Sequence, residues 1–147
     1  MSAIPNPWTR VVLLAGGAGT ASALKMCTAS MHKGTNALIM QALPTAAAHG
    51  VVDEFFADVA HAWPERVPSW HLDIALAASK SSRFADEMRE IAGTQAEVGL
   101  PAALFEGIAA VYERASRTPL GQTDPADVPR TATVGQVLDG LREDPHQ

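Results

Sequence analysis

The sequence of 147 residues predicts an all-α protein with one long central helix. Residues Thr20–His49 contain many helix formers and few breakers, and apolar residues lie on most sides of this segment. Aromatic residues make up only 5% of a chain that is 47% hydrophobic, so Ala, Leu, Val and Met must build the core. Small core residues let helices pack closely, and the order of elements shows no βαβ alternation. We therefore expect one helical domain, large enough to bury about 70% of its unfolded surface.

An irregular arm and a glycine-rich break come before the long helix. Residues 1–10 contain two prolines, and Val11–Ala15 is either a short strand or an extended lead-in. The glycines of Gly16–Gly19 end this segment. Pro44 should bend the helix, because proline removes a backbone donor and clashes one turn back. Gly50 is a natural stop.

Shorter helices are expected after the long one. Their ranges are Val51 or Val52 to Trp63, 69–79, Ser81 or Ser82 to Gly99, 101–117 and 133–141. Ser69 and a serine at 81 or 82 are the expected N-caps, and Pro101 suits a first helical turn. The chain is thus divided into an N-terminal arm (1–16), a helical domain (17–117), and a Pro/Gly-rich linker with a short C-terminal helix (118–147).

Composition and charge exclude several classes of partner. The net charge is −5 and the pI is near 5.4, and no Lys/Arg cluster offers a footprint for nucleic acid. The single cysteine, Cys27, permits no internal disulfide, which suits a reducing cytoplasm. The apolar run at Val11–Ala15 is too short for a membrane span or a signal-peptide core. We expect a cytoplasmic protein that binds neither nucleic acid nor membrane.

Four polar residues follow one face of the predicted long helix. They are Lys25, Thr28, His32 and Asn36. At 3.6 residues per turn they fall within an arc of roughly 90°. The rest of this helix is so apolar that we expect it to be buried, and a polar stripe on a buried helix either closes on itself or faces a pocket. Burying an unpaired lysine costs on the order of several kcal/mol, so a buried Lys25 is expected to have a partner or a function that accounts for its position.

Two members of the stripe are candidate catalytic residues. A desolvated Lys25 could act as a general acid/base or anchor a substrate oxyanion, although its stem could instead lie along the core with the amine at the edge. His32 could move a second proton, or it could be a hydrogen-bonded core histidine. The candidates for contacting a substrate without taking part in the chemistry are Ser22, Thr28, Asn36 and Trp70.

Two other patterns give weaker signals. Gly17-Ala18-Gly19 mimics the start of a dinucleotide fingerprint, but Ser22 takes the third position and a continuous helix follows in place of a βαβ unit. The histidines outside the stripe do not pair with carboxylates at metal-ligand spacing. We therefore expect the chain to bind no cofactor and no metal by itself.

Two sequence blocks carry a resemblance to a known family. The first is Ala21–Cys27 followed by Lys33–Thr35; the second is Phe84–Thr94 followed by Glu97–Pro101 and Ala110–Tyr112. Over about residues 17–117 the chain resembles the helical C-terminal domain of β-hydroxyacid dehydrogenases, the superfamily of 6-phosphogluconate and 3-hydroxyisobutyrate dehydrogenases. The phosphogluconate dehydrogenase-like subgroup is the best match.

This resemblance implies a fold, a partner and a role for one residue. The family's helical domain forms an intertwined dimer and closes a substrate cleft against an N-terminal Rossmann domain. Lys25 matches the catalytic lysine of the family, which implies an acid/base role toward a hydroxyl or carbonyl. The sequence also departs from the pattern: there is no room for a Rossmann domain before Gly16, Ala29 takes the place of an asparagine, and His32 stands where relatives carry a small hydroxyl residue.

Three functions remain in competition. The first is a stand-alone enzyme that uses the dehydrogenase pocket for cofactor-free acid/base chemistry at a carbonyl or imine, as an isomerase, cyclase or lyase. The second is the substrate-binding and dimerisation half of an NAD(P)-dependent dehydrogenase, with the Rossmann domain on another chain. The third is a non-catalytic dimeric binding module. All three predict a small-molecule ligand and a homodimer.

Overall fold

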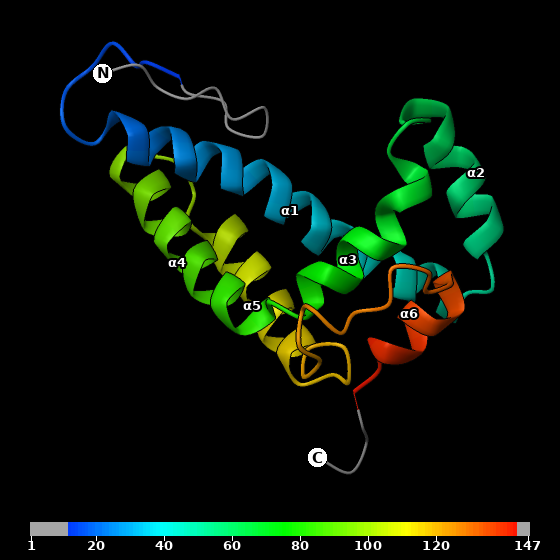
Figure 1. Cartoon of the computed structure of the whole chain (residues 1–147). Coiled ribbons are helices and arrows are strands. Elements are labelled where there is room, and N and C mark those ends of the chain that lie inside the picture. The colour runs from blue at the N-terminus through cyan, green and yellow to red at the C-terminus, as the bar shows by residue number, and fades with distance from the viewer. Residues whose placement is uncertain (1–11, 144–147) are drawn as a thin grey trace, which may run out of the picture.

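The computed structural model describes residues 12–143, and within them it contains helices and no strand (Figure 1). This confirms the predicted all-α class. The helices are α1 (Thr20–Ala48), α2 (Val52–Ala62), the 3-10 turn η1 (Val67–Ser69), α3 (Trp70–Ala78), α4 (Ser81–Glu97), α5 (Ala103–Ser116) and α6 (Val134–Gly140). None of them is long and apolar enough to cross a membrane.

The ends of α1 follow the glycines that the sequence places there. Gly19 precedes the helix with φ 95°, and Gly50 follows it with φ 71°, both in the left-handed region that favours glycine. Pro44 lies inside the helix, as expected. Residues 12–15 are irregular, so the lead-in alternative holds for them, while Val11 and the arm at 1–10 lie outside the described residues.

Ser69 lies at the predicted N-cap position of α3, but its side chain makes no capping hydrogen bond, and the predicted cap at 81 or 82 is wrong because Lys80 is the N-cap of α4. Ser69 has αR backbone angles because η1 runs directly into α3, whereas side-chain capping needs an extended backbone. Its hydroxyl donates instead to the Arg66 carbonyl oxygen at 3.1 Å and to Asp73 Oδ2 at 3.0 Å. Ser81 lies within α4 and donates back to the carbonyl oxygen of Ala77. The one capping box is at the start of α6, where Thr133 and Gln136 bond reciprocally.

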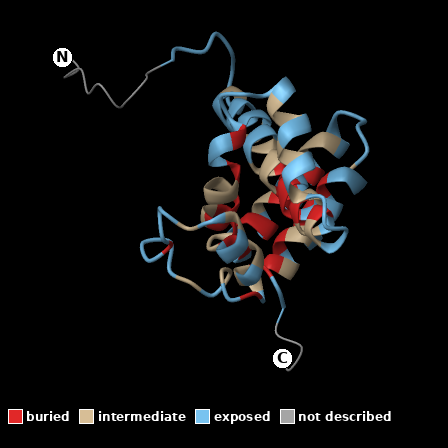
Figure 2. Ribbon diagram, turned by 90° about the vertical axis from the view of Figure 1, so that its right-hand side faces the viewer, coloured by how far each residue is buried: buried red, intermediate tan, exposed pale blue. Residues whose placement is uncertain are grey.

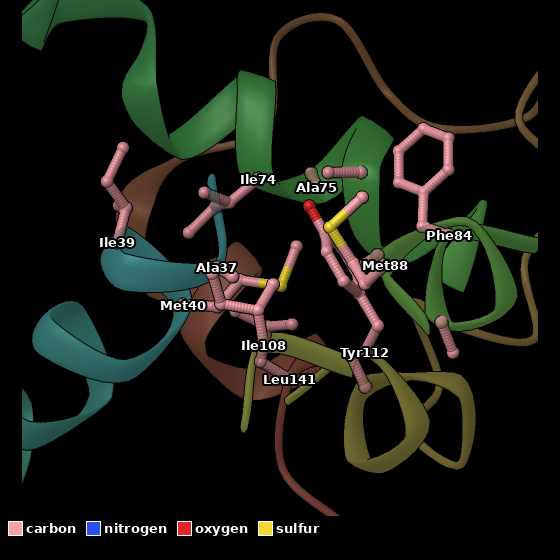
Figure 3. Close-up of a cluster of buried hydrophobic side chains, with 14 of the residues drawn as sticks. Ala37, Ile39, Met40, Ile74, Ala75, Phe84, Met88, Ile108, Tyr112 and Leu141 are labelled. Atoms are coloured by element: carbon pink, nitrogen blue, oxygen red, sulfur yellow. The ribbon is translucent and has the colours of Figure 1, made fainter. Parts of the chain in front are cut away.

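The helices pack around one apolar core. In Figure 1, α4 and α5 form an antiparallel hairpin with α1 along it, while α3 and α6 cover the C-terminal part of α1 and α2 lies at the far end. The buried residues gather where these helices meet (Figure 2). Met40, Ile74 and Met88 meet in this core, together with Tyr112 (Figure 3).

Helix α1 is covered on one side only. Its buried residues lie between Gly34 and Ala46, where α3, α5 and α6 contact it. Three apolar side chains on another face stay open, with exposed fractions of 47% at Leu24, 69% at Met31 and 64% at Leu38. The prediction that this helix is buried all round is therefore wrong for the single chain, because the five other helices are too few to surround 29 residues.

A polar and aromatic cluster joins α1 to the hairpin. The hydroxyl of Tyr112, on α5, is buried and donates to the carbonyl oxygen of Lys33 at 2.7 Å. The Tyr112 and Phe84 rings meet edge to face at 5.4 Å between centroids. Lys33 Nζ lies 4.2 Å from the centroid of the Phe84 ring and forms an ion pair with Glu87. Burial raises the pKa of the Tyr112 phenol, so the hydroxyl stays a donor.

Tyr112→Phe should lower the free energy of unfolding by about 1 kcal/mol, the typical net worth of one hydrogen bond. Tyr112→Leu should cost more, because it also removes the edge-to-face contact with Phe84. Urea unfolding followed by circular dichroism measures both changes. If Tyr112→Phe unfolds at the wild-type midpoint, the hydrogen bond contributes nothing to stability.

Candidate functional site

A small polar pocket opens between α1, the η1 region, α3 and the start of α4. Its volume is about 270 Å³. The residues that line it, called here the polar pocket, are His32, Asn36, Arg66, Asp73, Leu76, Ala77, Lys80 and Phe84. His32 and Asn36 come from adjacent turns of one helix face, so the helical periodicity brings them to the same hollow.

The polar pocket holds more positive than negative charge. Arg66 and Lys80 line it together with a single carboxylate, Asp73. Asp73 accepts a hydrogen bond from Ser69. Among residues 12–143, neither Arg66 nor Lys80 has a carboxylate oxygen within ion-pair distance. Two cations in a small hollow favour an anionic ligand, above all a carboxylate or phosphate.

The structure brings only two of the predicted stripe residues into this pocket. His32 and Asn36 line it, as the periodicity indicates. Lys25 and Thr28 lie on earlier turns of α1 and are exposed, as is Ser22. The expectation of a buried Lys25 is wrong for the single chain, because the side of these turns that packs on the core carries Met26 and Ala29.

The buried lysine of this helix is Lys33. Its side chain is only 18% exposed and is paired with Glu87. Burial lowers the pKa of Lys33, and the positive charges of Arg83 and Lys25 add to this effect against the opposing carboxylate of Glu90. Lys33 thus has the compensated, partly buried position that the sequence argument assigned to Lys25, and its role is to hold α1 against α4.

Trp70 lines a different cavity from the one predicted. This second hollow, called here the apolar cavity, has a volume of about 410 Å³ and lies between α1, α2 and α3. Its lining residues are Met31, Thr35, Leu38, Ile39, Ala42, Phe55, Val59, Trp63, Arg66 and Trp70. Trp70 therefore lines an apolar compartment beside the polar pocket, and its predicted contact with a substrate stays a prediction.

Three charged residues line the polar pocket that the sequence did not assign to it. Arg66 lies in the turn between two prolines, and Asp73 and Lys80 lie on and just after α3. Each is an ordinary surface residue in its local sequence, and only the packing of α3 against α1 brings it near His32. No periodic signal within one helix could have identified them.

The described residues contain no cluster of three or more potential metal ligands. Gly17 and its neighbours form a turn that leads into α1, where the Gly17 carbonyl oxygen accepts from the backbone and hydroxyl of Thr20. No strand precedes this turn within the described part of the chain, so the setting of a dinucleotide-binding turn is not formed there.

Comparison with known proteins identifies one domain within the chain. Residues 46–115 match the family model described as "Domain of unknown function (DUF1932)". Neither curated proteins nor solved structures give a match. The matched segment runs from the last turn of α1 to the last turn of α5 and includes Arg66, Asp73 and Lys80. DUF1932 is a helical C-terminal domain, which confirms the resemblance seen in the sequence. The match covers 46–115, just under half of the 147 residues, and the domain it identifies is the helical C-terminal domain of the 3-hydroxyisobutyrate/6-phosphogluconate dehydrogenase-like family.

Proposed function

We propose that the chain is the substrate-binding and acid/base half of an NAD(P)-dependent β-hydroxyacid dehydrogenase. The polar pocket binds a small hydroxy or keto acid, and a separate Rossmann domain holds the nucleotide. The observation that carries this proposal is the arrangement on α1. His32 and Asn36 open into a pocket with two unpaired cations, while Lys25, on the same helix face, is exposed within the described chain.

The charges and the volume of the polar pocket indicate the class of ligand that it binds. Arg66 offers a planar fork that suits a carboxylate, and Lys80 adds a point charge. Lys80 also immediately precedes the first turn of α4, where the helix dipole favours negative charge. A volume of about 270 Å³ suits a molecule of few heavy atoms. The ligand class that follows is a small organic anion.

The exposure of Lys25 argues for a second protein surface at the site. Acid/base work by a lysine is favoured where a surface removes water from the amine, and within the described chain nothing covers Lys25 in this way. Lys25 and His32 lie roughly 10 Å apart along the helix axis, since each residue adds 1.5 Å. A substrate held between them would also come near Ser22 and Thr28. A covering Rossmann domain would complete this site.

A second candidate function is a cofactor-free isomerase, cyclase or lyase in which a second copy of the chain supplies the cover. The exposed apolar stripe of Leu24, Met31 and Leu38 favours it, because the stripe lies on the same helix as Lys25.

A third candidate function is a binding module, in which the same dimer binds a ligand and carries out no reaction. In each case Cys27 stays reduced, and the cytoplasm is the compartment we propose.

Calorimetric titration with 3-hydroxyisobutyrate and 6-phosphogluconate tests the proposed pocket. At least one of these acids should bind, and Arg66→Ala and Lys80→Ala should each weaken binding about tenfold, which corresponds to about 1.4 kcal/mol. Arg142→Ala is the matched control, because Arg142 is exposed and lies outside the pocket. Failure of both acids to bind at millimolar concentration would contradict the proposal.

The chain should form a homodimer through the exposed stripe of α1. A stable interface usually buries about 1,200–2,000 Å² in total. Leu38→Glu should dissociate the dimer, because it places a charge in the apolar contact. Leu104→Glu is the control, since Leu104 is equally exposed, on α5, outside the stripe. Sedimentation at micromolar concentration measures both; a wild-type monomer would rule out the dimer.

Deuterium exchange separates the two enzymatic candidates. A cofactor-free acid/base enzyme should exchange the proton next to the carbonyl of a bound keto acid in D₂O without NAD(P). Lys25→Met and His32→Ala should then each slow the exchange by about 10²–10⁴-fold, with the helix content unchanged. Nuclear magnetic resonance of the keto acid follows the reaction. If the wild type gives no exchange, the cofactor-free candidate is excluded.

A further inference from the structure

The apolar cavity shares a wall with the polar pocket. Arg66 lines both of them. On α1, Met31 and Thr35 of the cavity each directly precede a residue of the pocket, His32 and Asn36. Consecutive residues of a helix point about 100° apart, so the two compartments lie on adjacent faces of the same turns. They are adjacent hollows that share Arg66 in their linings.

The cavity has the chemistry of a binding compartment for a flat or branched apolar group. Phe55, Trp63 and Trp70 supply three aromatic walls, and the two indoles lie 5.9 Å apart between ring centroids. The remaining walls are mostly aliphatic, among them Ile39 and Val59. A volume of about 410 Å³ accommodates a phenyl ring or a branched aliphatic chain.

One polar atom in this wall lacks a partner. Trp70 is only 6% exposed, and its indole N–H is buried with no hydrogen-bond acceptor among the described residues. Buried donors are normally paired, and leaving one unpaired is costly. The cavity itself combines apolar walls with one cation, Arg66, in its lining.

We infer that the acid bound in the polar pocket carries an aromatic or branched aliphatic substituent, and that this substituent occupies the apolar cavity. The inference rests on the proposed function, because the pocket must first bind an acid. Arg66 then holds the carboxylate at the boundary, with the polar part of the ligand toward His32 and the apolar part toward Trp63. Met31 and Leu38 also belong to the stripe proposed for dimer contact, so a second copy would shield this compartment from water.

Calorimetric titration of the full chain with two matched acids, 3-hydroxypropionate and 3-hydroxy-3-phenylpropionate, tests the inference. The phenyl acid should bind at least tenfold more tightly. Trp63→Ala should remove this preference; Trp63 is 54% exposed, so its removal should leave the fold intact, as circular dichroism can verify. Lys80→Ala should weaken both matched acids by the same factor.

The outcomes separate this inference from the proposed function. If both acids bind the wild type equally, the inference about the substituent is overturned, whereas the proposal that the polar pocket binds an acid is kept. If neither acid binds, the pocket itself is overturned, and the inference with it. If Trp63→Ala keeps the preference for the phenyl acid, or changes only the sedimentation of the dimer, the cavity belongs to the interface and the inference fails.

Discussion

The hydrogen bond from Tyr112 to the Lys33 carbonyl oxygen fixes the position of α1 on the rest of the molecule. A buried phenol must find an acceptor, and here the acceptor is one particular turn of the long helix. Once that turn is placed against α5, the direction of every neighbouring side chain follows from the helical period. His32 and Met31 then face two different hollows. Both compartments depend on how this turn of α1 is set against its neighbours, to which the Tyr112 hydrogen bond contributes.

The length of α1 has a second consequence. The chain can bury one side of the helix from Gly34 onward, but it leaves the stripe of Leu24, Met31 and Leu38 in water. The proposed dimer uses this stripe as its contact. The same turns carry Lys25, so a surface that covered the stripe would also change the surroundings of this lysine. In the proposed function, assembly and chemistry would therefore be linked through a single helix.

The sequence alone predicted the helices and the shared helix face of two residues that line the polar pocket. Periodicity and glycine positions predicted α1 and its ends, and they placed His32 and Asn36 on one face. The burial of Lys25 was predicted wrongly because an apolar pattern shows that a face will be covered, without showing which chain covers it. Arg66 and Lys80 could not be found, since their approach to His32 depends on packing between distant segments.

Two lysines of α1 differ in whether their charge is paired within the fold. Lys33 lies over the ring of Phe84 and is paired with Glu87, so its charge is used within the fold. Lys25, Arg66 and Lys80 have no carboxylate within ion-pair distance among residues 12–143. Exposed pairs of charges contribute little to stability, so leaving these cations unpaired costs the fold little. Their charge remains available to an anionic ligand, and two of the three line the same pocket.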